Sequence, residues 1–343
     1  MLNEKTILVT GGTGSFGKKF IETVLKRYKP KKVIVFSRDE LKQYEMQQNE
    51  TFRQYEEIMR YFIGDVRDLE RLKRAMEGVD IVVHAAALKQ VPAAEYNPFE
   101  AVKTNIIGAQ NVIDAALGHN VEKVIALSTD KAAAPINIYG ATKLTSDKLF
   151  IAANNYKGNR KIKFCVVRYG NVMGSRGSVI PLFLAKKKDG IIPITDPRMT
   201  RFNITLQEGV DFVLKCLEIT WGGELFVPKI PSYRILDVAK AVAPRAKIEI
   251  IGIRPGEKIH EELITVADSR NIIEFNDYFV ILPSTKLWDM EEFRKHSNKY
   301  EGKYPREEFS YNSGNNPVFL TVDELRKLIV ENIDGAKDII YSD

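Results

Sequence analysis

Short apolar stretches alternate with amphipathic stretches along the first half of the chain. The apolar stretches are rich in β-branched residues and predict strands, namely TILVT, KVIVFS, MRYFIGD, DIVVHAA, KVIALST and KFCVVRYGN. Between them, the spacing of apolar positions predicts helices near 15–28, 39–58, 68–77 and 97–119, and a helix that begins near Tyr139. This alternation of strand and helix predicts an α/β fold with a doubly wound parallel sheet.

The character of the chain changes past Asn171. Gly, Pro and Arg become frequent, in the segments GSRGSVIP, GIIPITDPRMTRF and IIGIRPGEK, while LQEGVDFVLKCLEI and VDELRKLIVENI predict shorter helices. We expect a cofactor-binding domain of residues 1–175 plus about 204–222, and a smaller C-terminal α/β lobe of about 176–203 and 223–343. Ligands of open α/β sheets bind beyond the carboxyl ends of the strands, so this lobe is expected to close over that edge and bind substrate.

Composition excludes several classes of partner. The 343 residues carry a formal net charge of +6 at pH 7, but Lys and Arg are interspersed with Asp and Glu. An anionic small molecule accounts for that excess, so we expect no nucleic-acid partner. An apolar strand begins almost at once, and no run is long enough to span a bilayer, so we expect a cytoplasmic protein without membrane contact. Four scattered histidines predict no metal site, and Cys165 and Cys216 lie in apolar stretches typical of core residues.

The segment ILVTGGTGSFGKKF joins the first predicted strand to the first predicted helix. Glycines at its spacing allow a tight turn and a close approach of the backbone to a pyrophosphate, which the helix N-terminus then faces. We therefore expect a Rossmann-type domain with a dinucleotide cofactor. The residues expected at the cofactor are Gly11, Thr13, Gly14, Ser15, Phe16 and Gly17.

The end of the second predicted strand bears on the choice between NAD and NADP. An NAD enzyme usually carries an acid there, whereas this chain reads Ser37 and Arg38, with Lys42 one helical turn further on. A hydroxyl and a guanidinium suit a 2′-phosphate, so NADP is favoured, although the neighbouring Asp39 keeps NAD possible. Asp65, after the third strand, is expected to accept a hydrogen bond from the adenine amino group.

A second motif follows the fifth predicted strand, in STDKAAAPINIYGATK. Tyr139 and Lys143 are four residues apart, which places both side chains on one face of a helix. A nearby ammonium lowers the pKa of a phenol, so Tyr139 is expected to take a proton from a sugar hydroxyl while hydride leaves for the nicotinamide. Together with the glycine loop upstream, this motif indicates a dehydrogenase-type site.

With these motifs in place, the chain resembles an extended short-chain dehydrogenase/reductase. More narrowly, it is similar to the inverting UDP-N-acetylglucosamine 4,6-dehydratases of the pseudaminic acid pathway. The similar segments include TGGTGSFGKKF, SRDELKQYEM, HAAALKQVPAAEYNP, ALSTDKAAAPINIYGATKL, PITDPRMTRFNIT and IIGIRPGEKIHEE, within residues 5 to 285. The resemblance implies NADP that is tightly bound and regenerated in each turnover, a UDP-sugar substrate, and a homo-oligomer, by resemblance a hexamer.

The resemblance gives roles to Thr129, Asp130 and Lys131. Sugar 4,6-dehydratases that retain C5 configuration typically have Asp-Glu here, whereas the inverting group has Asp-Lys. Oxidation at C4 makes the C5 proton acidic; Lys131 is then the expected base and Asp130 the acid that protonates the departing C6 hydroxyl. Lys131 must be neutral and Asp130 protonated for this, and we expect burial to shift both pKa values in the needed direction.

Further residues follow from the resemblance. Thr129 is expected to hydrogen-bond the sugar O4, and Asn105 to lie near the catalytic Tyr. The expected substrate contacts are Lys89, Asn171, Arg201, Arg254 and Glu257. The two arginines suit a diphosphate, although an ordinary ion pair between the lobes explains either of them equally well.

One position departs from the family pattern. Relatives of the pseudaminic pathway usually read ALKHVP, whereas Gln90 stands at the place of His, as in related capsule-forming dehydratase/5-epimerases. The pathway therefore stays open. Two rival functions also stay open: a nucleotide-sugar 4-epimerase, which needs no acid and base beside Thr129, and a non-catalytic NADPH-binding regulator, which needs no intact Tyr139 and Lys143.

Overall fold

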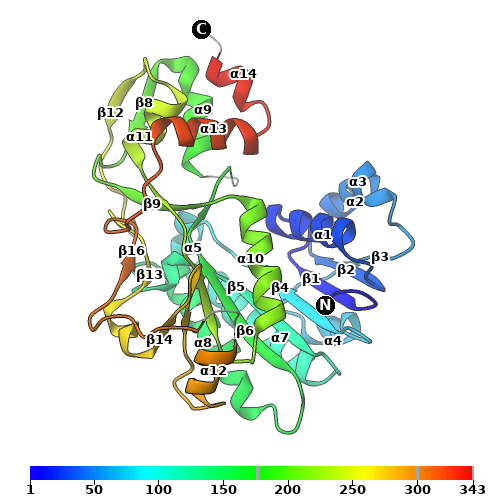
Figure 1. The fold of residues 1–343 in the computed structure, drawn as a ribbon. Coiled ribbons are helices and arrows are strands. Elements are labelled where there is room, and N and C mark those ends of the chain that lie inside the picture. The colour runs from blue at the N-terminus through cyan, green and yellow to red at the C-terminus, as the bar shows by residue number, and fades with distance from the viewer. Residues whose placement is uncertain (175–177, 298–300, 342–343) are drawn as a thin grey trace.

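The structure is a computed structural model that describes residues 1–174, 178–297 and 301–341. A large sheet with helices packed against it forms the lower body in Figure 1, and a smaller lobe that carries the C-terminal helices lies above it. The boundary that we expected between residues 175 and 176 lies outside the described residues.

Among the described residues, nine strands form the central sheet, in the order β14-β15-β10-β6-β5-β4-β1-β2-β3. Their bounds are β1 (Thr6–Thr10), β2 (Lys32–Ser37), β3 (Met59–Ile63), β4 (Ile81–His84), β5 (Lys123–Thr129), β6 (Lys163–Tyr169), β10 (Leu225–Pro228), β14 (Ile272–Glu274) and β15 (Tyr278–Ile281). All neighbours from β3 to β10 pair in parallel, whereas β15 and β14 are antiparallel. The predicted strands and the doubly wound α/β class are confirmed.

Strand order reverses between β1 and β4, because the chain first builds outward to β3 and then returns to the other side of β1. In open α/β sheets, this switch point is where the crevice for a dinucleotide opens. The buried strands are nearly continuous apolar runs, and β1 is buried at every position. Parallel strands covered on both faces have this composition.

The predicted helices of the lower body are present with two differences, and two further helices, Val91–Tyr96 and Met290–His296, were not predicted. The helices of this body are α1 (Ser15–Arg27), α2 (Glu40–Gln48), α3 (Glu50–Arg53), α4 (Leu69–Ala75), α5 (Val91–Tyr96), α6 (Pro98–Val102), α7 (Gly108–Leu117), α8 (Ile138–Tyr156), α10 (Leu206–Ile219) and α12 (Met290–His296). The single helix expected near 39–58 is wrong: it breaks at Asn49, whose side chain accepts from the Thr51 backbone and starts α3 anew. α1 packs against α10, and α7 packs between α4 and α8.

The helix expected near 97–119 contains one turn of wider winding. Between α6 and α7 lies the π-helix η1 (Lys103–Ile107), which includes Asn105. The Asn105 side chain donates to the Leu88 carbonyl at 2.9 Å and to Thr142 Oγ1 at 3.0 Å. It thereby links the segment after β4 to α8, and such π turns are common at functional sites.

The upper lobe in Figure 1 has an apolar core of its own, built by Ile180, Phe183, Val238 and Leu325 among others. Its elements are α9 (Val179–Lys186), η3 (Lys187–Asp189), β8 (Ile191–Ile194), α11 (Ile235–Val242), β12 (Lys247–Ile250), α13 (Val322–Asn332) and α14 (Ala336–Tyr341). The small sheet β11-β9-β7, from Ser232–Arg234, Thr200–Ile204 and Asn171–Val172, contributes residues to both cores. A two-stranded sheet, β13-β16, from Glu262–Ile264 and Tyr311–Asn312, packs against the core of the large sheet.

Part of the range 223–343, which we assigned to the smaller lobe, lies in the large sheet instead. β10 pairs with β6, and β15 and β14 extend the sheet beyond it. The reason is that β10 supplies apolar residues to the same core as β6, with Phe226 and Val227 fully buried. A division of labour in which one body binds cofactor and the other binds substrate stays a prediction.

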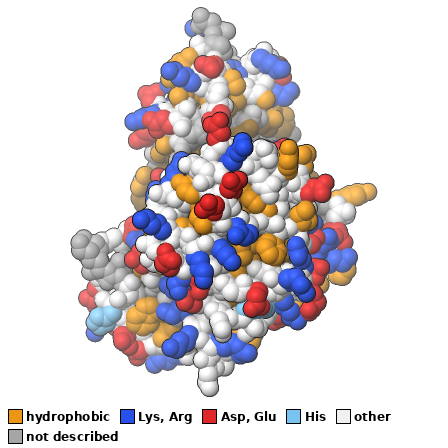
Figure 2. Space-filling model, turned by 90° about the vertical axis from the view of Figure 1, so that its right-hand side faces the viewer, with side chains coloured by type: hydrophobic (Ala, Val, Ile, Leu, Met, Phe, Trp, Pro, Cys, Tyr) orange, Lys and Arg blue, Asp and Glu red, His pale blue; other side chains and the backbone are white. Residues whose placement is uncertain are grey.

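Charged side chains of both signs are interspersed over the face seen in Figure 2, as the sequence indicated. Both cysteines are buried, as expected of core residues. None of the described helices is both long enough and apolar enough to cross a bilayer.

A buried ion pair ties the middle of the large sheet to α8. Arg168 on β6 lies 3.1 Å from Asp147 Oδ2 on α8, and both side chains are at most 4% exposed. Ser128 Oγ, near the end of β5, donates to the same carboxylate oxygen at 2.7 Å. Asp147 lies one turn after Lys143, so this network fixes the helix that carries the Tyr139 motif against the ends of two strands.

We expect Asp147→Ala to lower the free energy of unfolding by about 3–5 kcal/mol, because it leaves the buried Arg168 charge without a partner. Denaturant titration followed by fluorescence measures this loss. The matched control is Glu70→Ala, which removes an exposed ion pair with Lys73 and should change stability by less than about 1 kcal/mol. Equal effects of the two substitutions would contradict the structural role of the buried pair.

Candidate active site

The expected site residues converge because they follow strands that run in parallel. The glycine loop follows β1, Ser37 ends β2, Asp65 follows β3 and Thr129 ends β5. The carboxyl ends of parallel strands lie along one edge of the sheet. The structure therefore brings these segments, which are distant in sequence, to one edge.

The glycine loop turns tightly between β1 and α1. Gly11 has a φ of +66°, a conformation that favours glycine, and the Gly14 backbone donates to its carbonyl at 2.9 Å. A side chain at Gly17 would place its Cβ 2.6 Å from the Gly11 oxygen, so α1 can approach the loop only with glycine there. α1 begins at Ser15 and directs its N-terminus to this loop, with Thr13 and Phe16 beside it. The geometry suits a pyrophosphate.

The residues expected at a 2′-phosphate lie together at the end of β2. Ser37 Oγ contacts Thr13 Oγ1 at 2.8 Å, and the Arg38 side chain is 52% exposed. Asp39 caps α2 by accepting from the Lys42 backbone, and it also forms an ion pair with Lys42 Nζ. Asp39, the acid that kept NAD possible, is therefore already bonded to Lys42 of α2, whereas the Arg38 side chain is half exposed.

Asp65 lies at the same edge but is held by two arginines. Arg67 Nε donates to Asp65 Oδ2 at 2.9 Å, and Arg38 Nη1 lies 3.4 Å from that oxygen. Burial alone would raise the pKa of Asp65, but hydrogen bonds from Arg67 and the two positive charges lower it below its ordinary value. Asp65 thus stays ionised and able to accept a hydrogen bond. Its expected contact with adenine stays a prediction.

Tyr139 and Lys143 lie on one face of α8, as the spacing predicted, and both are at least 91% buried. The start of α8 packs on the turn after β5 because position 140 has no side chain: a Cβ at Gly140 would lie 2.1 Å from the Lys131 carbonyl oxygen. Asn137 caps the helix and donates to the Gly256 carbonyl at 2.9 Å. α8 is therefore fixed to two loops of the site.

The pKa values of this pair reflect their burial. Burial raises the pKa of Tyr139 to about 12, although the Lys131 charge and a hydrogen bond with Thr129 oppose the shift. Burial lowers the pKa of Lys143 below its ordinary value. The lowered phenol pKa that we expected of Tyr139 is therefore wrong for the ligand-free site, where burial outweighs the Lys131 charge.

Asp130 and Lys131 form the 3₁₀ turn η2 (Asp130–Ala132) directly after β5. Asp130 is 1% exposed, and its Oδ1 accepts from Thr129 Oγ1 at 2.9 Å and from Lys131 Nζ at 3.0 Å. The other oxygen, Oδ2, has no hydrogen-bond partner among the described residues. A buried carboxyl and an amine thus lie in direct contact beside Tyr139.

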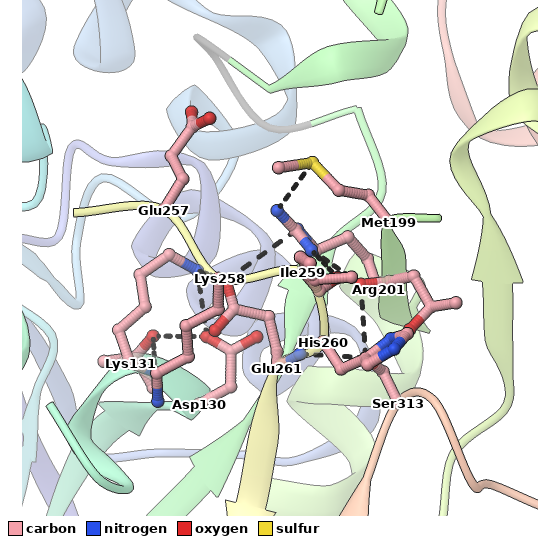
Figure 3. A network of polar contacts seen from close by, with 12 residues as sticks. Asp130, Lys131, Met199, Arg201, Glu257, Lys258, Ile259, His260, Glu261 and Ser313 are labelled. Carbon is pink, nitrogen blue, oxygen red and sulfur yellow. Dashed lines mark hydrogen bonds and ion pairs between the residues drawn. The ribbon is translucent and has the colours of Figure 1, made fainter. Parts of the chain in front are cut away.

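A second carboxylate, which the sequence analysis missed, faces Lys131 from another part of the chain. Figure 3 shows Glu261 next to the Asp130–Lys131 pair, with Arg201 on its other side. Glu261 Oε1 lies 3.4 Å from Lys131 Nζ and 3.7 Å from Arg201 Nε, and the residue is 3% exposed. Its only signal in the sequence is a place in the segment IIGIRPGEKIHEE, which we quoted for the resemblance.

Glu261 changes the expected charge of Lys131. Burial alone would lower the pKa of Lys131, but the Asp130 and Glu261 carboxylates together raise it above its ordinary value. Burial raises the pKa of Asp130, and although Lys131 opposes this, the result lies above the ordinary value. The expectation that burial shifts both groups in the needed direction is confirmed in direction for Asp130 and wrong for Lys131, because two negative charges outweigh the desolvation of its ammonium group.

Segments of the later chain hold Glu261 in place. Ser313 Oγ accepts from the Glu261 backbone at 2.9 Å and contacts Thr200 Oγ1 at 2.7 Å. Thr200 Oγ1 also contacts His260 Nδ1 at 2.8 Å. The segment around Ser313 lies beyond residue 285, outside the range of the family resemblance, and it braces the site.

The expected substrate residues do not all meet. Arg201 lies in the catalytic cluster, where its Nη1 also donates to the carbonyls of Thr200 and Ile259. Arg254 is 57% exposed and pairs with Glu257 at 3.5 Å. Asn171 on β7 has a buried Oδ1 without a partner in the described chain.

Lys89 and Gln90 are exposed in the segment between β4 and α5. Gln90 occupies the N-cap position of α5, but its side chain forms no capping hydrogen bond. The structure therefore gives no reason why His should be replaced at this position. The described residues contain no group of three or more His, Cys, Asp or Glu side chains that could hold a metal ion.

Comparison with known proteins supports the same family. Residues 7–283 match the family described as polysaccharide biosynthesis protein. A protein of Campylobacter jejuni subsp. jejuni named UDP-N-acetylglucosamine 4,6-dehydratase (inverting) is 55% identical over 332 residues, which are 96% of this chain and 98% of that protein. A protein of Rickettsia conorii named UDP-glucose 4-epimerase is 44% identical over 289 residues, covering 82% and 84% of the two chains.

A solved structure agrees along nearly the whole chain. The X-ray structure of Pen from Bacillus thuringiensis is 41% identical, has a TM-score of 0.85, and matches 96% of this chain and 99% of its own. The resemblance drawn from the motifs is thereby confirmed. The chain belongs to the polysaccharide biosynthesis protein family, among the extended short-chain dehydrogenase/reductases.

Proposed function

We propose that this protein is a UDP-N-acetylglucosamine 4,6-dehydratase that inverts C5 of the sugar. The observation that carries the proposal is the contact of the buried Asp130 carboxyl with Lys131 beside Tyr139, because dehydration needs an acid and a base where oxidation occurs. The name of the Campylobacter relative, at 55% identity, supports the same reaction and substrate.

We assign the first step to Tyr139 and Lys143. Tyr139 takes the O4 proton, and the ammonium of Lys143, one helical turn away, stabilises the resulting phenolate. Thr129, which hydrogen-bonds the same phenol, orients O4 toward it. A nicotinamide held at this edge of the sheet would supply the hydride acceptor for C4 and the hydride for C6.

Asp130 and Lys131 carry the elimination. The C4 ketone acidifies the C5 proton, which Lys131 removes as an amine, while Asp130 gives a proton to the C6 hydroxyl so that it leaves as water. Addition of hydride at C6 would leave an enolate, and a proton that exchanges with solvent then adds to C5 from the opposite face, which gives a 4-keto-6-deoxy sugar with C5 inverted. The elimination needs a neutral Lys131 and a protonated Asp130 at its start.

One proton transfer produces both working forms. Lys131 Nζ donates to Asp130 Oδ1 at 3.0 Å, so moving that proton converts the ammonium–carboxylate pair into an amine and a carboxylic acid without changing the net charge. The raised pKa of Asp130 favours this transfer, whereas the raised pKa of Lys131 opposes it. Exclusion of water by bound substrate favours the neutral pair, since desolvation disfavours charged forms.

For the cofactor, we propose NADP, regenerated in each turnover. The glycine loop from Gly11 to Gly17 receives the pyrophosphate, and Ser37, Arg38 and Lys42 receive the 2′-phosphate. The support is the half-exposed Arg38 guanidinium and the engagement of Asp39 by α2. For the uridine diphosphate, we propose Asn171, Arg201, Arg254 and Glu257, with Lys89 toward the sugar. A homo-oligomer, by resemblance a hexamer, stays a prediction.

The Rickettsia relative favours one alternative, a nucleotide-sugar 4-epimerase. An epimerase uses Tyr139 and Lys143 in the same way but requires no acid and base at the next positions. Burying Asp130 against Lys131 costs desolvation energy, and an epimerase gives no functional reason for that cost. The non-catalytic regulator is less favoured still, since Thr129, Tyr139 and Lys143 are all present and brought together.

Incubation of the protein with UDP-N-acetylglucosamine in deuterated water, without added cofactor, tests the function. We expect loss of one water, deuterium at C5 and an inverted C5 centre, measured by NMR and mass spectrometry. Lys131→Gln should slow C5 labelling by about 100-fold or more, since it removes the general base, while the exposed control Lys73→Gln should not. Inversion at C4 with C5 unlabelled would establish the epimerase instead, and an unchanged sugar would exclude both.

Arg38→Ala tests the cofactor. Hydrogen bonds to charged groups contribute about 1.5–3 kcal/mol, so we expect NADP to bind about 10- to 100-fold more weakly while NAD affinity stays nearly constant. Calorimetric titration of cofactor-stripped protein measures both constants. Arg27→Ala, which removes an equally exposed arginine on α1, is the control. Tighter binding of NAD than of NADP by the unaltered protein would overturn the assignment.

A further inference from the structure

Four charges of alternating sign line up at the end of β5. Asp130 contacts Lys131, Lys131 contacts Glu261, and Glu261 contacts Arg201, as Figure 3 shows. Asp130 Oδ2 and Glu261 Oε2 are buried without hydrogen-bond partners among the described residues. The proposed elimination uses the first two charges, so the placement of the other two calls for a reason of its own.

We propose that Glu261 is a positioning residue that holds Lys131 in its ammonium form in the empty site, and that Arg201 limits the strength of this hold. The inference rests on the proposed function, because it concerns when the C5 base becomes available. Glu261 acts through Lys131, and it is not itself assigned a contact with the sugar.

The geometry gives Lys131 two competing carboxylates. Its Nζ lies 3.0 Å from Asp130 Oδ1 and 3.4 Å from Glu261 Oε1, so the ammonium group bridges the two acids. Transfer of its proton to Asp130 would leave an amine beside the Glu261 carboxylate. The negative charge of Glu261 attracts the ammonium form of Lys131 much more strongly than the neutral amine. It therefore opposes the proton transfer to Asp130 that would make Lys131 a base.

Arg201 acts in the opposite sense. Its Nε is 3.7 Å from Glu261 Oε1, and the carbonyls of Thr200 and Ile259 hold its Nη1 at 2.7 Å and 3.0 Å. The guanidinium charge is thereby kept beside Glu261, where it offsets part of the negative charge that Lys131 experiences. The effects of the two residues on Lys131 have opposite signs.

The cluster is built to keep these distances. Ser313 accepts from the Glu261 backbone, and the Glu261 carbonyl accepts from the Ser313 backbone at 2.8 Å. The titratable and charged groups that act on Lys131 or its carboxylate partners come from five separate parts of the fold. They are Asp130, Tyr139, Arg201, Tyr233, Lys258 and Glu261.

Glu261 and Arg201 have opposite effects on the charge of Lys131, so replacing them should change its reactivity in opposite directions. Loosened packing in both variants would instead change the reactivity in the same direction. In the ligand-free full chain, trace acetic anhydride at pH 8 acetylates each lysine in proportion to its neutral fraction, and mass spectrometry of the peptide that carries Lys131 gives its relative rate. One pKa unit changes that fraction tenfold, so Glu261→Gln should raise the Lys131 rate several-fold, to about tenfold. Arg201→Gln should lower it.

The control is Glu262→Gln, one residue further along. Among the described residues Lys131 forms ion pairs with Asp130 and Glu261 but not with Glu262, so Glu262→Gln should leave the Lys131 rate unchanged. Glu261→Asp, which keeps the charge, should stay close to the unaltered protein, and it preserves the test if the Gln variant fails to fold. Equal rates in all variants, or increases in both Glu261→Gln and Arg201→Gln, would overturn the proposal.

Turnover separates this inference from the function on which it rests. In Glu261→Gln, the acid limb of the pH profile for C5 deuterium exchange should move down by about one pH unit. An activity loss that is uniform across pH would show a structural role and contradict the inference. Absence of dehydration in the unaltered protein would instead refute the proposed function, whatever the labelling rates of the variants.

Discussion

Parallel pairing of the strands from β3 to β10 determines where every candidate residue lies. Each of these strands must be followed by a crossover, and each crossover leaves the sheet at the same edge. The glycine loop, the Ser37–Arg38 turn, Asp65 and the Thr129–Lys131 turn are therefore neighbours, although long stretches of chain separate them. The antiparallel β15 and β14 lie outside this arrangement and contribute none of the assigned residues.

The same edge carries charges that water cannot stabilise. Buried charges are tolerated when each has a partner of opposite sign at close range. The alternation from Asp130 to Arg201 meets this condition along one line, and the Asp147–Arg168 pair meets it between α8 and β6. The first group includes two carboxylate oxygens that lack hydrogen-bond partners among the described residues, and in the second Arg168 Nε lacks one. Ser128 adds a further hydrogen bond to Asp147.

How much could be predicted follows from the range of the interactions. Some features depend only on neighbours within a few residues and could therefore be predicted. They are the strands from β1 to β6, the glycine turn, and the shared helix face of Tyr139 and Lys143. The helix break at Asn49 depends only on a local cap, but it was not predicted because the residues on both sides of it favour helix. Glu261 could not be assigned, because its effect on Lys131 exists only after β13 is placed beside η2. The prediction that Lys131 is neutral was wrong for the same reason.

The brace formed by Ser313 has a consequence for the order of events during synthesis. Chains fold from the N-terminus as they leave the ribosome, so the strands from β1 to β6 and the Tyr139 helix can form early. The residue that fixes Glu261 beside Lys131 is made far later, and it is also bound to Thr200. A nascent chain that has not reached Ser313 would contain the motifs of the site, but Glu261 would not yet be fixed beside Lys131. The electrostatic environment of Lys131 is thereby coupled to translation past Ser313.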